Sequence, residues 1–77
     1  MTRPINVIAR EIALDWKKPY FGAVPYLQAM HSLSSINDRY IYDDGRSVVL
    51  YFMSNATTWR GETARRIKAE LKEILKR

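Results

Sequence analysis

The stretch DRYIYDDGRSVVLYFMSN (residues 38–55) decides the fold, because its residues fit two different structures. The segments YIY and SVVLYF on either side of DDG match the sequence signal for a β-hairpin. The same residues fit a helix over 44–55, with Asp43 or Asp44 as its N-cap and Asn55 near its end. No third strand is found elsewhere, and an isolated two-stranded hairpin is only marginally stable. We therefore predict the helix, and a hairpin within 40–53 is the alternative.

Three other segments carry apolar residues at the spacing of an amphipathic helix. Thr2 and Pro4 mark the start of the first segment, and Pro19 and Gly22 separate it from the second. Thr57 or Thr58 is the expected cap of the last. The sequence thus predicts one all-α domain over 1–77, a compact bundle of about four helices. Their approximate ranges are 4–18, 25–35, 44–55 and 58–76.

Two apolar patterns predict how these helices pack. Residues 48–53 (VVLYFM) point all round their helix, so we expect it to be the buried central helix. Val7 and Leu14 fall opposite the apolar stripe of the first helix. They indicate either a wide buried face, which we favour, or a contact with another element or subunit.

Composition narrows the classes of function. The chain has 77 residues, no cysteine and a single histidine, His31, so we expect neither a disulfide scaffold nor a metal, and no cofactor. The only candidate acid pair, Asp43 and Asp44, suits a turn and a helix cap better than catalysis, so we expect no enzyme. No run approaches the roughly 20 apolar residues of a membrane span, and a cytoplasmic protein is expected. The net charge of +5 favours an acidic partner.

The last helix carries a strip of positive charge. At about 100° per residue, Arg65, Lys68, Lys72 and Lys76 share one side of it. On the neighbouring side, the spacing pairs Glu62 with Arg66 and Glu73 with Arg77. The helix dipole accounts for the cations of the last turn, but not for Arg65 and Lys68. The strip therefore indicates either contact with phosphate groups or a solvated basic face.

Trp59, Arg60 and Gly61 stand at the start of this helix. Trp and Arg often anchor protein interfaces, so Trp59 and Arg60, with Tyr20 and Phe21 of an aromatic loop, form a candidate protein interface. Alternatively, Trp59 folds back onto the core and Arg60 extends into solvent.

At PYLQAM, DRY and SVVLYFMSNATTWRGETARRIKAEL, the sequence resembles small proteins encoded by bacteriophages and by prophages in bacterial genomes, a group without an assigned activity. The resemblance implies a cytoplasmic protein of an infected or lysogenic bacterium that acts by binding. The favoured function is contact with nucleic-acid backbone through Arg60, Arg65, Lys68, Lys72 and Lys76. The alternative is an inhibitor of a host enzyme or defence complex, or a structural homo-oligomer.

Overall fold

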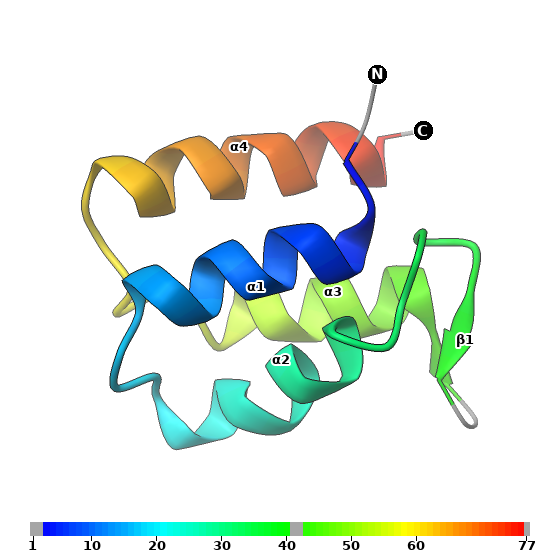
Figure 1. Ribbon diagram of the computed structural model, residues 1–77, viewed down its shortest axis with the longest axis horizontal. Helices are drawn as coiled ribbons and strands as arrows, with labels where there is room; N and C mark the ends of the chain where they lie inside the picture. The colour runs from blue at the N-terminus through cyan, green and yellow to red at the C-terminus, as the bar shows by residue number, and fades with distance from the viewer. Residues whose placement is uncertain (1–2, 41–42, 77) are drawn as a thin grey trace.

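A computed structural model describes residues 3–40 and 43–76 (Figure 1). This part of the chain contains four α-helices, one 3₁₀ turn and two very short strands, so the prediction of an all-α bundle is confirmed. In chain order these elements are α1 (Ile5–Asp15), η1 (Phe21–Ala23), α2 (Val24–Met30), β1 (Arg39–Tyr40), β2 (Asp43–Asp44), α3 (Gly45–Ser54) and α4 (Glu62–Leu75).

The ambiguous stretch folds as a helix that is preceded by a minimal strand pair. Asp44 is the N-cap of α3, and its Oδ1 accepts a hydrogen bond from the backbone N–H of Ser47 at 2.7 Å. Arg39 pairs with Asp44 and Tyr40 with Asp43 in the antiparallel ladder. The predicted helix is therefore confirmed, and the alternative hairpin is wrong for SVVLYF, which is helical throughout. Its YIY part falls mostly on residues 41 and 42, outside the described residues.

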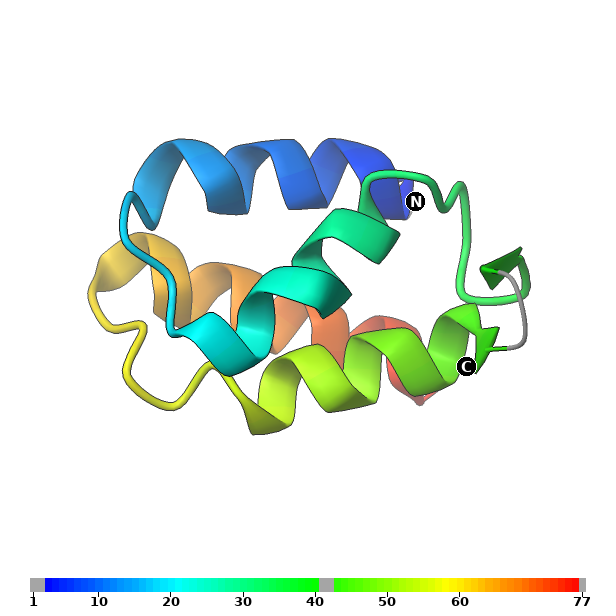
Figure 2. The same ribbon diagram turned by 90° about the horizontal axis from the view of Figure 1, so that it is seen from below.

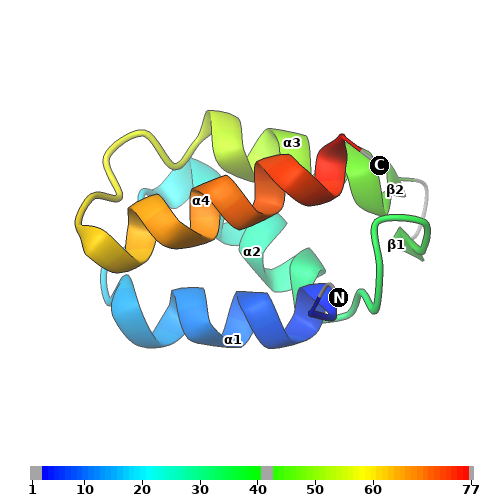
Figure 3. The same ribbon diagram turned by 90° about the horizontal axis from the view of Figure 1, so that it is seen from above.

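The four helices surround one hydrophobic core. α2 packs against α1 and α3 on one side, and α4 packs against the same two helices on the other. Seen from below, α2 crosses between α1 and α3 (Figure 2), and seen from above, α4 runs over the gap between them (Figure 3). Every helix contributes buried side chains to this core, and Phe52 of α3 is completely buried in it. None of the helices in the described ranges is long and apolar enough to cross a membrane.

All four helices are shorter than predicted, and the start of α4 shows the clearest reason. Gly61 has φ 117° and ψ 178°, a backbone conformation that cannot continue a helix, so α4 begins at Glu62 instead of near residue 58. The predicted Thr57 or Thr58 cap is wrong, since Gly61 is the N-cap and supplies no side-chain hydrogen bond. The start signal expected at Thr2 lies outside the described residues.

Two packing predictions are wrong. α3 is not buried all round, because Leu50 is 49% exposed and Tyr51 is 50% exposed, while Val48, Val49 and Phe52 face the core. Val7 (37% exposed) and Leu14 (67%) are not part of a wide buried face on α1. A helix at the edge of a small bundle has solvent on its outer side, and these residues lie there.

Candidate functional site

The candidate site is built around Trp59, which the loop between α3 and α4 turns into the core. Its ring stacks on Trp16 at 5.7 Å between centroids and meets the Phe52 ring edge-on at 6.4 Å. Its Nε1 donates a hydrogen bond to Oδ2 of Asp15 at 2.9 Å. Only 2% of Trp59 is exposed, so the prediction that it anchors a protein interface is wrong. The alternative, in which it folds back onto the core, is the observed one.

Lys68, in the second turn of α4, is held against Trp59. Its Nζ donates to the backbone carbonyl of Trp59 at 2.7 Å and lies 5.8 Å from the centroid of the Trp59 ring. Burial lowers the pKa of the Lys68 ammonium below its ordinary value, and the nearby charge of Arg60 lowers it further. Lys68 is therefore not part of a freely solvated basic face, because it is half-buried and has a partner.

These residues border a hollow of about 300 Å³ at the first turn of α4. Three cationic side chains line it, those of Arg60, Arg65 and Lys68, and no acidic residue lies among its lining residues. Arg60 and Arg65 are exposed. The hollow therefore brings together three of the five residues predicted to bind phosphate, in a form that suits a negatively charged group.

The two remaining predicted cations continue this surface along α4. Lys72 and Lys76 are exposed, one and two turns beyond Lys68. We call Arg60, Arg65, Lys68, Lys72 and Lys76 together the basic strip.

The opposite flank of α4 is neutralised by ion pairs to the N-terminal part of the chain. Arg3 donates to Glu70 at 2.6 and 2.9 Å and to Glu11 at 2.7 Å, and Arg66 also bonds Glu11. These contacts lower the pKa of Glu11, mainly through the hydrogen bond from Arg3. Arg66 was predicted to pair with Glu62, but Glu11 of α1 is its partner in the structure. The predicted pair of Glu73 with Arg77 involves a residue outside the described range.

Sequence reasoning missed Arg46, which extends the positive charge at the far end of α4. Its Nη1 donates to the carbonyl of Leu75, the residue before Lys76. Arg46 lies 29 positions before Leu75 in the chain, and no spacing rule connects them. Only the packing of α3 beside α4 reveals this contact.

The aromatic loop is exposed, as the protein-interface hypothesis requires. Phe21 is 79% exposed and Tyr20 is 45% exposed, and their ring centroids are 4.8 Å apart. Because Trp59 is buried, however, the structure does not place the four predicted interface residues on one exposed surface.

Among residues 3–40 and 43–76, no group of three or more His, Asp or Glu side chains is arranged to hold a metal ion.

Comparison with known proteins adds no assignment to this site. No family model matches the chain, and neither a curated protein nor a solved structure is significantly similar to it.

Proposed function

We propose that this is a small phage-type protein of the bacterial cytoplasm that binds the phosphate backbone of nucleic acid through α4, without catalysis. The observation that carries the proposal is the hollow in which Arg60, Arg65 and Lys68 meet without an acidic lining residue. Burial is the main cause of the lowered pKa of Lys68, and the charge of Arg60 adds to it, as expected for neighbouring cations that repel one another. A phosphate group in the hollow would relieve this repulsion.

The length of the basic strip suits several phosphates in a row. With a rise of about 1.5 Å per residue, the distance along the helix axis from Arg65 to Lys76 is about 16 Å. Duplex DNA carries one phosphate per roughly 3.4 Å of axis on each strand, so the strip spans several of them. These contacts fix the protein on the backbone and carry no sequence information. We therefore expect binding without base specificity.

The test is the salt dependence of binding, measured by fluorescence anisotropy with a labelled duplex of mixed sequence. Four exposed cations, Arg60, Arg65, Lys72 and Lys76, predict a log–log slope of about −3 to −4, at about −0.9 per phosphate contact. The double variant R65Q/K72Q should flatten the slope by about two units. Both side chains are exposed, so the fold should be unaffected.

The matched control is R10Q/K18Q, which removes the same charge at two exposed positions outside α4. It should leave the slope nearly unchanged. Equal flattening by both double variants would show that only net charge matters, and no binding at low salt would exclude a nucleic-acid partner.

A protein partner is the second candidate, favoured by the exposed ring pair of Tyr20 and Phe21. Aromatic side chains are enriched at protein–protein interfaces, and this pair is already exposed. The partner would be a second copy of the chain, or a host enzyme or defence complex that the protein inhibits. Sedimentation velocity tests the first case, because Phe21→Ser should abolish any self-association of the wild type. Association that persists in this variant would exclude the loop as the interface.

A further inference from the structure

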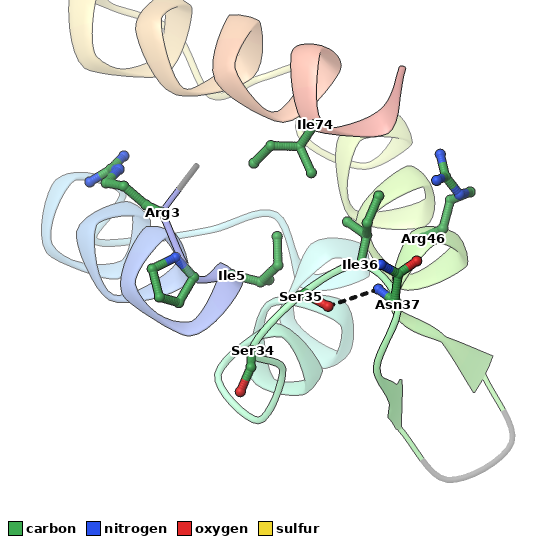
Figure 4. A pocket seen from close by; sticks show the side chains of 9 residues that line it. Arg3, Ile5, Ser34, Ser35, Ile36, Asn37, Arg46 and Ile74 are labelled. Atoms are coloured by element: carbon green, nitrogen blue, oxygen red, sulfur yellow. Dashed lines mark hydrogen bonds between the residues drawn. The ribbon is translucent and has the colours of Figure 1, made fainter. Parts of the chain in front are cut away.

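A second cavity, of about 360 Å³, opens at the other end of the bundle (Figure 4). It lies between the start of α1, residues 34–37, the start of α3 and the end of α4. The side chains of Ile5, Ile36 and Ile74 form its apolar floor, and Ser34, Asn37 and Arg46 stand around it. Ligand pockets have volumes of about 300–1,000 Å³ and combine mostly apolar walls with a few polar groups. This cavity lies at the small end of that size range, and its lining combines four apolar residues, Pro4 and the three isoleucines, with five polar or charged ones.

Backbone contacts fix the wall formed by residues 34–37. The backbone N–H of Ile5 donates to the carbonyl of Ser34 at 3.0 Å, which joins this segment to α1. The N–H of Gly45 donates to the carbonyl of Asp38 at 2.6 Å, which joins it to α3. Within the segment, Oδ2 of Asp38 accepts from the N–H of Ser34 at 2.7 Å. The cavity is therefore preformed, and a ligand would lose little free energy in ordering it.

Gly45 brings α3 close to the same segment. A Cβ atom at Gly45 would lie 2.8 Å from the carbonyl oxygen of Ser35 and 2.9 Å from that of Ile36. Only a residue without a side chain allows this approach, so the close contact between the helix and the cavity wall depends on glycine.

The charge of the cavity comes from Arg46. Arg3 also lines the cavity, but its guanidinium is bound by Glu70 and Glu11. Among the described residues, Arg46 forms no ion pair with a carboxylate, and its one hydrogen bond is to the carbonyl of Leu75, which occupies one of its five N–H donors. No acidic residue is among the lining residues. A ligand with a negatively charged group therefore matches the charge of this cavity.

We propose that this cavity binds a small organic carboxylate with an apolar body. The body would lie on the three isoleucines, which point toward one another in Figure 4, and the carboxylate would reach Arg46. Asn37 also lines the cavity and offers an amide donor. The proposal does not depend on nucleic-acid binding, because the cavity shares no lining residue with the basic strip.

The experiment uses hexanoate as the probe and follows backbone amide resonances by NMR. Hexanoate should shift the resonances of Ile36, Asn37 and Ile74 in a saturable way, with a dissociation constant on the order of 1 mM for so small a ligand. Hexylammonium has the opposite charge and hexanol none, so both should bind at least about tenfold more weakly. Inorganic phosphate should shift resonances at the start of α4 and leave the cavity unaffected.

Two isosteric variants provide the matched comparison. Asn37→Asp places a carboxylate on the lining of the cavity, where it repels the ligand and competes with it for Arg46, and should weaken hexanoate binding by about tenfold or more. Gln28→Glu makes the same chemical change at an exposed position on α2, outside the cavity, and should leave the affinity within about twofold. Both positions are exposed, so both variants should fold.

Three results would overturn the proposal. The first is that hexanoate causes no saturable shift. The second is that hexanol binds as well as hexanoate, because the cavity would then be an apolar crevice in which Arg46 has no role. Equal weakening by Asn37→Asp and Gln28→Glu would show a response to net charge alone.

Discussion

Gly61 sets the start of α4, and replacing it by alanine tests whether its backbone conformation is as demanding as its dihedral angles indicate. Its φ of 117° and ψ of 178° lie in a region that is essentially restricted to glycine, and a residue with a side chain held there costs about 1–3 kcal/mol. A Cβ at Gly61 would meet no atom within 4 Å. Because there is no clash, the whole penalty comes from the backbone, and we expect Gly61→Ala to lower the free energy of unfolding by about 1–3 kcal/mol.

Urea denaturation followed by circular dichroism measures this penalty. A chain of this size typically has an m value near the lower end of about 1–3 kcal/mol/M, so the midpoint should fall by roughly 1–3 M with m unchanged. The control is D-alanine at position 61, introduced by chemical synthesis. D-alanine accepts positive φ, so it should not destabilise and should add about 0.4–1 kcal/mol by restricting the unfolded chain. Equal destabilisation by L- and D-alanine, or a loss below about 0.5 kcal/mol with L-alanine, would refute the reasoning.

Three further predictions concern residues that hold the bundle together. Trp59→Ala removes the ring that stacks on Trp16 and should destabilise by about 3–5 kcal/mol, enough to unfold most of so small a protein, as circular dichroism would show. Asp44→Ala removes the cap of α3 and should lower the urea midpoint, whereas Asp44→Asn should restore most of it. Glu11 has its pKa lowered below 4.5 by Arg3 and Arg66, so its contribution to stability is present above that pH and is lost as the pH falls through the lower, folded-state pKa. Glu11→Gln should therefore show a smaller loss of stability below about pH 4.5 in acid titrations.

The elements of the fold could be predicted from the sequence wherever local chemistry decides them. Asp44 caps α3 because its side chain reaches an N–H three residues ahead, and this is a short-range signal. The apolar stripe of α4 is also local, and Ala64, Ile67 and Leu71 are buried as their spacing predicts. Helix ends were predicted less well, because Gly61 determines one of them through a positive φ that its neighbours do not reveal.

The candidate site could be predicted only in part, because its geometry depends on contacts between distant segments. The basic strip was found by helical spacing, but the partner of Lys68 is a backbone carbonyl nine positions away, set by the turn before α4. Trp59 is buried because Trp16, the C-cap of α1, stacks on it, and Asp15, the last residue of α1 and 44 positions earlier in the chain, accepts from its Nε1. The residues that surround Trp59 in the sequence do not show whether its ring is buried against α1 or exposed as an interface anchor.

The two flanks of α4 differ because the acids of the bundle are distributed unevenly around it. On the flank facing α1, Glu11 and Glu70 are bound by Arg3 and Arg66, so two cations and two carboxylates balance each other. The spacing within α4 alone predicted a different pairing, and α1 overrides it by bringing Glu11 to Arg66. These carboxylates are then engaged away from the basic strip, whose hollow has no acidic lining residue. A charge pattern needed only for solubility would intersperse the two signs, whereas this arrangement concentrates one sign on one surface. That concentration is the physical reason to test the strip with phosphate before any other ligand.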